Sequence, residues 1–317
     1  MKNQLKLLTV SIFSTFSFTA FAVTNGYPDC EDNQTNLNCK HPNVLMASLF
    51  DESGVTITGT RCSASLIKAD QDKAVILTAG HCVDPIIQGL VQGNYGVSFD
   101  AKIFKPNPDG GIFNNHQFIM GAIPINNSYY QGYKTDYAAI VLPLQNGLAT
   151  TVDGRQVNIL DIAPVTLAPL GLMDQVNKEE VKLVDVGYGT NAIKTNPNDN
   201  GNAATVVRTE FGNRNISENG LYQNNSISGG MLLKIQQNLA RDQSGTCFGD
   251  SGGPTFYLDA SGKEIQVGIH SIGNNLTCNG WAGSYRVDIE QTQVFLKCLM
   301  VDGKSIDQLK ACGVTLN

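Results

Sequence analysis

Short apolar runs separated by turn-forming residues recur along most of the chain. They have the length of β-strands, and the residues between them are rich in Gly, Asn, Ser and Thr. The clearest runs read "NVLMASLF", "RCSASLI", "AVILTAG", "YAAIVLPL", "VKLVDVGYG", "PTFYLD" and "IQVGIHSIG". Many short strands joined by turns are typical of an all-β sandwich or barrel, so the pattern predicts that fold class.

Two regions depart from the strand-and-turn pattern. Near the end, "IEQTQVFLKCLM" spaces Ile289, Val294, Phe295 and Met300 more as a helix does. Residues 191–230 are rich in Asn and Gly. We therefore expect one helix near the C-terminus and long surface loops over 191–230.

The N-terminal segment differs from the rest in being a single apolar stretch with a positive start. Lys2 and Lys6 precede an apolar run from Leu7 to Thr19, which is shorter than the roughly 20 residues that a membrane helix needs. Ala20-Phe21-Ala22 has the small residues of a cleavage site. We therefore expect residues 1–22 to be a secretory signal peptide, and an uncleaved membrane anchor is the alternative.

Composition narrows the class of protein further. The 317 residues, 42% hydrophobic and 16% charged, are enough for two globular domains. A formal net charge of −6 without a basic cluster argues against nucleic acid or an anionic membrane as a partner. All 8 cysteines follow the signal segment, and an even number in an exported chain indicates disulfides. Their spacing does not suggest a metal site, and we expect no metal and no cofactor.

Three residues stand in contexts that suit nucleophilic catalysis. His81 follows the buried-strand pattern of "AVILTAGHCV", although a lone histidine there is more often structural. Asp136 precedes the apolar run of "TDYAAIVL"; such a residue usually belongs to a turn, but a buried carboxylate would need a partner such as a histidine. Ser251 lies in "GTCFGDSGGP", where glycines allow backbone N–H groups to converge on an oxyanion. A serine hydroxyl needs a base to become a good nucleophile.

Taken together, the segments "LTAGHCV", "TDYAAIVL", "GTCFGDSGGP" and "GIHSIG" resemble the chymotrypsin/trypsin-like serine peptidases, in the family's order of His, Asp and Ser. "DVGYGT" resembles the family's Gly-Trp-Gly segment, with Tyr188 in place of tryptophan. The resemblance covers residues 23 to about 300. Loops lengthen the stretches 84–130 and 190–245, and the family pattern assigns nothing to them.

The resemblance implies an all-β fold of two antiparallel six-stranded β-barrels with the active site between them and a C-terminal helix. We expect the first barrel over 23–170, with His81 and Asp136, and the second over 171–317, with Ser251, the helix and the tail. The strand-and-turn pattern agrees with this fold, although by itself it predicts only the all-β class.

The mechanism implied by the resemblance has one role for each residue. His81 would be general base and then general acid, Asp136 would orient its ring, and Ser251 would form an acyl-enzyme. The backbone N–H groups of Gly249 and Ser251 would form the oxyanion hole. Ser271 would lie beside Asp136, and its strand would pair with the substrate backbone.

The resemblance also implies a specificity pocket, made by Gly245, Thr246, His270, Ser271, Gly273 and Gly283. Trypsin-like members hold a basic side chain with an aspartate six residues before the nucleophile, where this chain has Gly245. We therefore do not expect cleavage after Lys or Arg. Thr246 and His270 resemble the pair with which glutamyl endopeptidases meet a substrate carboxylate, which predicts cleavage after Glu or Asp. A neutral pocket that prefers apolar or aromatic side chains is the alternative.

Activation and disulfides are implied in the same way. In this family a new N-terminus pairs with the aspartate before the nucleophile, and here the expected pair is Val23, directly after the predicted signal cleavage, with Asp250. The resemblance pairs Cys62 with Cys82 and Cys247 with Cys278. The four that remain are close in sequence, and we pair them as Cys30–Cys39 and Cys298–Cys312.

The resulting expectation is a secreted, monomeric serine endopeptidase that acts on proteins or peptides. It would be extracellular, or periplasmic if the source is bacterial, and would bind no nucleic acid and, after signal cleavage, no membrane. The alternative of another class is an inactive binding protein on a peptidase scaffold. Such proteins usually lose one of the three catalytic residues, whereas all three stand in this sequence.

Overall fold

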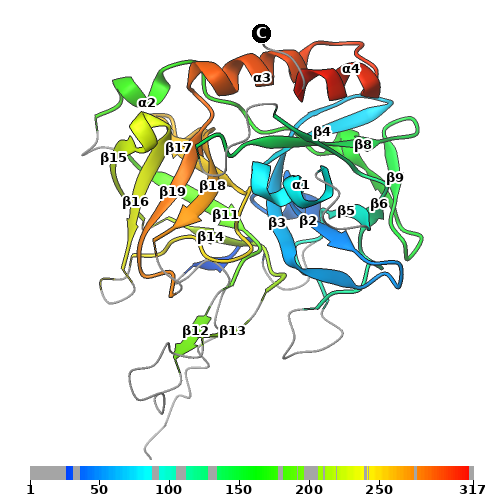
Figure 1. The fold of residues 1–317 in the computed structure, drawn as a ribbon, viewed down its shortest axis with the longest axis horizontal. Helices are drawn as coiled ribbons and strands as arrows, with labels where there is room; N and C mark the ends of the chain where they lie inside the picture. Colours follow the sequence, from blue (N-terminus) through cyan, green and yellow to red (C-terminus); the bar gives the residue numbers. More distant parts are fainter. Residues whose placement is uncertain are drawn as a thin grey trace, which may run out of the picture.

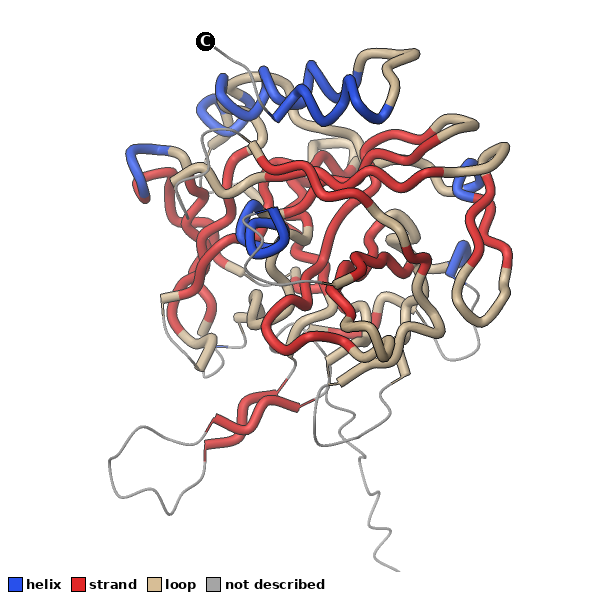
Figure 2. Tube along the Cα trace, turned by 45° about the vertical axis from the view of Figure 1, so that its right-hand side comes forward, coloured by secondary structure: helices blue, strands red, loops and turns tan. Residues whose placement is uncertain are grey.

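The computed structural model describes residues 26–30, 36–87, 93–104, 112–127, 134–177, 181–190, 192–195, 206–209, 211–218, 220–238, 241, 243–274 and 277–313. Strands dominate this part of the chain, and the helices are short (Figures 1 and 2). They are α1 (Gly80–Ile87), α2 (Leu172–Gln175), α3 (Glu290–Met300) and α4 (Ile306–Lys310), with 3-10 turns at Asn36–Asn38, Ile159–Asp161, Ser228–Gly230 and Ala311–Gly313. In these ranges no helix has the length and apolar character to cross a membrane.

The first sheet comes from the N-terminal half of the chain. Its strand order is β6-β5-β2-β3-β4-β8-β7, and every neighbouring pair is antiparallel. The strands are β2 (Val44–Phe50), β3 (Thr56–Ala69), β4 (Lys73–Thr78), β5 (Asn94–Ser98), β6 (Ile119–Met120), β7 (Ile123–Asn126) and β8 (Ala138–Pro143). A small ladder of β9 (Leu148–Thr150) and β10 (Gln156–Asn158) lies beyond them in sequence.

The second sheet comes from the C-terminal half, with one strand from the N-terminal segment at its edge. Its order is β1-β14-β11-β17-β18-β19-β16-β15, again antiparallel throughout. The strands are β1 (Tyr27–Pro28), β11 (Leu183–Gly187), β14 (Asn215–Ser217), β15 (Leu221–Ile227), β16 (Leu232–Gln237), β17 (Pro254–Leu258), β18 (Glu264–Gly273) and β19 (Gly280–Arg286). A ladder of β12 (Ala192–Thr195) and β13 (Val206–Thr209) projects away from this body (Figure 1).

The two curled sheets lie side by side, and α3 and α4 run across one end of both (Figure 1). This arrangement confirms the predicted fold class with its C-terminal helix. The sheets contain seven and eight strands rather than the six expected of each. Two of the additional strands, β1 and β6, are edge strands of only two residues, and β15 extends the far edge of the second sheet.

The expectation of long loops over 191–230 is wrong for four strands: β12 and β13 form a ladder of their own, and β14 and β15 are strands of the second sheet. Their sequences are polar, but Ile216 and Tyr222 are buried in the core. The many Asn and Ser residues of β14 and β15 mask the apolar alternation that would indicate strands. Such polar side chains can be accommodated because they form hydrogen bonds within the fold. Ser217, for example, shares a hydrogen bond of 2.7 Å with Ser244.

Buried side chains on both faces of β2 explain how the two sheets form one body. Every residue of this strand is buried. Leu45 and Leu49 belong to a cluster within the first sheet, whereas Val44 and Met46 belong to a larger cluster that also contains Val184 of β11. Successive side chains of a strand point to opposite faces. The continuous apolar run of β2 therefore packs into its own sheet on one face and toward the second sheet on the other.

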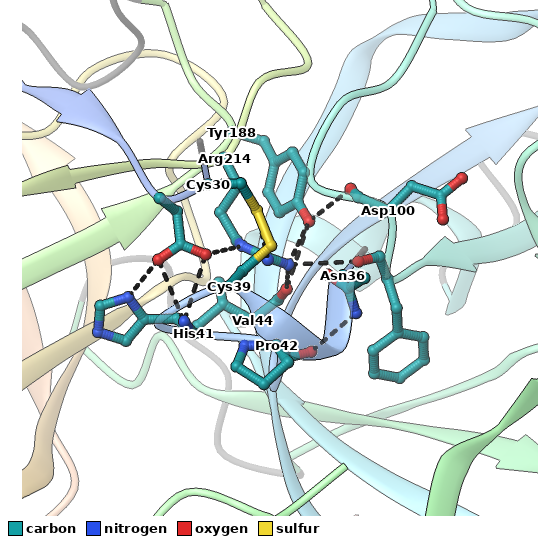
Figure 3. Close-up of a disulfide and its surroundings, with 11 residues drawn as sticks. Cys30, Asn36, Cys39, His41, Pro42, Val44, Asp100, Tyr188 and Arg214 are labelled. Carbon is teal, nitrogen blue, oxygen red and sulfur yellow. Dashed lines mark hydrogen bonds and ion pairs between the residues drawn. A yellow bond between two sulfur atoms is a disulfide. The ribbon is translucent and has the colours of Figure 1, made fainter. Parts of the chain in front are cut away.

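A cluster of buried charges fastens the N-terminal segment to this body (Figure 3). His41 Nδ1 lies 2.6 Å from Asp29 Oδ1, and Nε2 lies 3.0 Å from Glu264 Oε2 on β18. His41 is 1% exposed. Burial opposes its charged form, but the hydrogen bonds and charges of Asp29 and Glu264 outweigh this effect, so the pKa of His41 is raised. The same two partners have lowered pKa values, which places a cation between two anions.

Replacement of His41 with Gln should destabilise the protein in a pH-dependent way. A raised folded pKa means that the charged ring contributes fully below its unfolded pKa of about 6.5 and loses that contribution as pH rises through the folded pKa. Denaturant unfolding at pH 5.5 should show a deficit of about 3–5 kcal/mol, the scale of a broken buried pair. At pH 9.5 the deficit should be smaller. An equal deficit at both pH values would contradict a charged His41 in the folded state.

Candidate active site

The pairing of β4 with β8 brings His81 and Asp136 together. Thr78 pairs with Ala138, so the residues that follow β4 and those that precede β8 lie at the same end of the sheet. His81 Nδ1 lies 2.8 Å from Asp136 Oδ2, and the His81 backbone N–H donates to Asp136 Oδ1 at 2.9 Å. Asp136 is 1% exposed, whereas the His81 ring is 37% exposed. The carboxylate therefore fixes the ring through Nδ1 and leaves Nε2 for a reacting proton.

Ser271 of β18 supplies a third hydrogen bond to the same carboxylate. Its Oγ donates to Asp136 Oδ2 at 2.6 Å. Because β18 belongs to the second sheet, Asp136 is held by donors from both sheets. The hydrogen bond and charge of Asp136 also act on His81: burial opposes the charged ring, but Asp136 outweighs it and raises the pKa of His81.

The turn that carries Ser251 lies against the segment that carries His81. An ideal Cβ at Gly252 would lie 2.1 Å from Thr78 Oγ1 and 2.4 Å from the Ser63 carbonyl oxygen, so only glycine fits this position. Gly252 also has a φ of +83°. The Ser63 N–H donates to the Ser251 carbonyl at 2.8 Å, and the Gly252 N–H donates to the His270 carbonyl at 2.8 Å. Both sheets thus fix the backbone of the serine.

The peptide before Gly249 is oriented by its carbonyl group. The Phe248 carbonyl accepts the Thr190 N–H at 2.8 Å. In a trans peptide the C=O and N–H point in opposite directions, so the Gly249 N–H is turned away from Thr190. Among the described residues, neither the Gly249 N–H nor the Ser251 N–H has a hydrogen-bond acceptor. Two such N–H groups on one turn can stabilise an oxyanion.

Asp250 is fully buried directly beneath this turn. Its Oδ1 accepts the Gly189 N–H and its Oδ2 accepts the Cys247 N–H, each at 2.8 Å. Burial nevertheless raises the pKa of Asp250 to about 7. The expected partner of Asp250, Val23, lies outside the described residues.

Gln237 occupies the space next to Gly245, where trypsin-like enzymes carry an aspartate. An ideal Cβ at Gly245 would lie 1.9 Å from Gln237 Oε1. Gln237 Nε2 donates to the Thr246 carbonyl at 2.9 Å and to the Cys278 carbonyl at 2.8 Å, which orients the amide. Gln237 is 1% exposed, and its Oε1 has no hydrogen-bond partner among the described residues. Gln237 was not predicted from the sequence, although it continues the buried alternation of Leu233 and Ile235.

His270 belongs to a buried polar chain. Its Nδ1 lies 3.2 Å from both Thr255 Oγ1 and Ser284 Oγ, and Thr255 Oγ1 donates to Asp185 Oδ1 at 2.8 Å. Burial lowers the pKa of His270 to about 3, so the ring is neutral, and it raises the pKa of Asp185 to about 7. The other ring nitrogen of His270, Nε2, is buried without a partner in the described part of the chain.

The register of β18 and β19 separates the expected pocket residues. His270 pairs with Ser284, and Gly273 pairs with Ala282, two residues earlier on β19 and on the same face of that strand. Gly283 lies on the other face, where an ideal Cβ would meet Ile272 Cγ1 at 2.9 Å. The structure therefore does not bring Gly283 to the face of His270, and Ala282 stands there instead. Thr246 is buried beside Gly245.

Four disulfides join Cys30–Cys39, Cys62–Cys82, Cys247–Cys278 and Cys298–Cys312. Cys62–Cys82 ties β3 to α1 next to His81, and Cys247–Cys278 ties the serine segment to the start of β19. A ring nitrogen of His81 and the sulfur atoms of Cys62 and Cys82 lie within 4.8 Å of one another, a spacing that metal ligands also have. Sulfur atoms in a disulfide are not thiolates, and this cluster is therefore no metal site.

Comparisons with known proteins bear on the family and the fold of the chain. The family model described as Trypsin matches residues 38–289. The "Trypsin-like protease" of Streptomyces glaucescens is 27% identical over 231 residues, which cover 71% of this chain and 69% of that protein. A solved structure titled HL collagenase is 20% identical with a TM-score of 0.52, over 90% of this chain and 100% of its own. At that identity, the last likeness shows the fold alone.

The matches to the Trypsin family model and to a trypsin-like protease support the class of serine endopeptidases. The family match covers well over half of the sequence, and the chain therefore belongs to the trypsin family. The enzyme class is thereby established as serine endopeptidase.

Replacement of Asp136 with Asn should lower kcat by about 10⁴-fold, the typical effect of losing this orienting carboxylate. It should also move the acidic limb of kcat/KM to lower pH, because Asp136 raises the pKa of His81. In the native enzyme that limb should lie above pH 6.5, since the base must be neutral. Profiles of kcat/KM against pH for both enzymes test this, and an unmoved limb would argue against His81 as the base.

Proposed function

We propose that the chain is a secreted endopeptidase in which Ser251, His81 and Asp136 cleave peptide bonds through an acyl-enzyme. The observation that carries this proposal is the ring of His81, held by Asp136 through Nδ1 with Nε2 left over, beside a serine turn with two N–H groups that have no acceptor in the described part of the chain. The substrates are proteins or peptides, and the protein is a monomer that needs no cofactor. The four disulfides and the N-terminal apolar segment support export.

The chemistry follows from this geometry. Ser251 Oγ attacks the carbonyl carbon while its proton passes to His81 Nε2, and Asp136 stabilises the imidazolium. The oxyanion is bound by the N–H groups of Gly249 and Ser251. The C–N bond then breaks as His81 gives its proton to the leaving amine. Water repeats both steps on the ester, releasing the acid and restoring the serine. The edge at 271–273 supports the substrate backbone as an added strand.

Replacement of Ser251 with Ala should lower kcat by about 10⁶-fold and leave the fold intact. The matched control is Ser261→Ala, because Ser261 lies in an exposed turn and should be dispensable. Peptide hydrolysis, circular dichroism and labelling by an organophosphorus agent are the measurements. If native protein is not labelled, the alternative of a binding protein on a peptidase scaffold holds. Substantial turnover by the Ser251 variant would remove the assignment of the nucleophile.

We further propose that the enzyme does not cleave after Lys or Arg. The position of the basic-specific aspartate is Gly245, and Gln237 fills the adjoining space with a neutral amide. An amide oxygen offers a hydrogen bond but no charge, so it cannot compensate the desolvation of a guanidinium or ammonium group.

Acidic side chains are the first candidate for the residue before the cleaved bond. The buried Nε2 of His270, which has no partner among the residues that the structure describes, supports this candidate, because a carboxylate would satisfy an Nε2–H donor there. The Ser284 hydroxyl, 3.2 Å from Nδ1, can donate to that nitrogen and so place the proton on Nε2. Apolar or aromatic side chains are the second candidate. They are supported by the small walls at Gly273 and Ala282 and by a histidine that stays neutral.

A peptide library should show cleavage after Glu or Asp, and Thr246→Val should reduce this preference selectively. Valine keeps the volume of threonine but removes the hydroxyl donor, so the rate ratio of Glu to Gln peptides should fall by about ten-fold, one hydrogen bond to a charged group. Rates on Phe peptides serve as the internal control and should not change. Preference for Phe, Tyr or Leu would favour the second candidate, and preference for Arg or Lys would contradict both.

We also propose that cleavage after Ala22 activates the enzyme by exposing the amino group of Val23 as the partner of Asp250. Asp250 supports this, because a fully buried carboxylate with a pKa of about 7 lacks a cation among the described residues. β1 also supports it. The strand begins at Tyr27 and pairs with β14, whose Asn215 is opposite Gly187, and the ideal Cβ of Gly187 lies 2.2 Å from Asp250 Oδ1.

A further inference from the structure

We propose that Arg214 is a positioning residue, which holds the oxyanion turn in place through Tyr188. This inference rests on the proposed oxyanion hole at Gly249 and Ser251. It assigns a role in turnover to the buried cluster around the Cys30–Cys39 disulfide (Figure 3).

Arg214 is buried almost completely, and its guanidinium joins four parts of the chain. Nε donates to Asp29 Oδ2 at 2.6 Å. Nη1 donates to the carbonyl groups of Val44 and Phe99, at 2.8 and 3.2 Å, and to the Tyr188 hydroxyl at 3.2 Å. The residue is 1% exposed. A buried guanidinium with this many fixed partners forms a rigid support.

Tyr188 carries this support to the active site. Its ring lies against the guanidinium, with 5.9 Å between the Arg214 Cζ atom and the ring centre. Its hydroxyl donates to the Asp100 carbonyl at 2.8 Å, and its backbone N–H donates to Ser63 Oγ at 2.9 Å. Ser63 Oγ in turn donates to the Gly249 carbonyl at 2.9 Å. The side chain of Arg214 thus fixes the position of Tyr188. The residues that follow Tyr188 in sequence contact the oxyanion turn.

The two residues after Tyr188 form hydrogen bonds to that turn directly. The Gly189 N–H donates to Asp250 Oδ1, and the Thr190 N–H donates to the Phe248 carbonyl, each at 2.8 Å. The second bond sets the plane of the peptide whose N–H belongs to Gly249. A shift of Tyr188 would therefore rotate an oxyanion donor, although Arg214 itself touches no reacting atom.

The N-terminal loop keeps Arg214 in position. Asp29, next to the disulfide, is bound by both Arg214 and His41, and its backbone N–H donates to the Arg214 carbonyl at 3.1 Å. Lysine at this position would keep the charge but lose the planar fork that serves Asp29, two carbonyl groups and Tyr188 together. Arg214→Lys is therefore a variant that weakens the link without leaving an unpaired Asp29.

The matched control is Arg286→Lys. Arg286 is also buried, at 3% exposure, and its guanidinium binds Asp288 with bonds of 2.8 and 2.9 Å. It lies at the end of β19, and the hydrogen-bond and ion-pair partners of its guanidinium among the described residues, Asp288, Gly230 and Asp174, are not part of the oxyanion turn. A purely structural role for Arg214 predicts that both variants lose thermal stability and nothing else.

The experiment compares native enzyme and both variants in kcat, KM, melting temperature and inhibition by a peptide aldehyde with the best library sequence. The hemiacetal of an aldehyde places its oxygen in the oxyanion hole, so its inhibition constant reports on the hole directly. Arg214→Lys should lower kcat by about ten-fold, a fraction of the loss expected for a whole donor, and weaken the aldehyde equally. KM should change by less than about two-fold, and Arg286→Lys should alter only the melting temperature.

A folded Arg214→Lys variant with native kcat and native aldehyde inhibition would overturn the proposal. If that variant does not fold, Tyr188→Phe decides, because it keeps the ring and removes the hydroxyl that Arg214 binds. It should lower kcat by about three-fold with KM unchanged, and native kcat would again overturn the proposal. Native enzyme that resists the aldehyde, or an active Ser251→Ala variant, would instead reject the proposed oxyanion hole and nucleophile.

Discussion

The rest of the site depends on the hydrogen bonds that the carboxylate of Asp136 accepts. This carboxylate accepts the His81 N–H, the His81 ring and the Ser271 hydroxyl, and these donors come from two different sheets. Burial of a carboxylate without such donors would cost free energy. The donors from both sheets offset this cost and so stabilise the contact between the sheets at Asp136. The same contact orients the histidine. Stability of the sheet interface and alignment of the base are therefore consequences of one hydrogen-bonded group.

The serine side of the site is built almost entirely from backbone contacts. Ser63, Gly189, Thr190 and His270 hold the turn through main-chain groups or a single hydroxyl, and Gly252 allows no side chain at all. Backbone groups have few rotational states, so a turn fixed in this way requires little reorganisation when charge develops on the substrate. The position of the turn therefore depends on residues outside it, because the residues that flank a main-chain segment determine where it lies.

The all-β class could be predicted from the sequence because its signals are local, whereas the two-sheet arrangement and the roles proposed for His81, Asp136 and Ser251 came from the resemblance to a peptidase family. Apolar runs mark the strands, and Ser251 stands in a glycine turn that few other arrangements require. Gln237, Asp185 and Arg214 could not be predicted, since each acquires its partners from strands far away in sequence. Gly283 illustrates the limit. The resemblance places it in the specificity pocket, whereas the irregular register of β18 against β19 puts it on the strand face opposite to Ala282 and Ser284. β14 and β15 could not be recognised as strands because most of their residues are polar, although Ile216 and Tyr222 are buried.

The division of the triad between two sheets also governs when hydrolysis becomes possible. His81 and Asp136 lie in the part of the chain that is synthesised first, but Ser251 and Ser271 are supplied more than one hundred residues later. In the proposed mechanism, a chain that lacks the second sheet would have a base without a nucleophile and an aspartate without its third donor. Peptide hydrolysis would therefore require both sheets to be formed and joined.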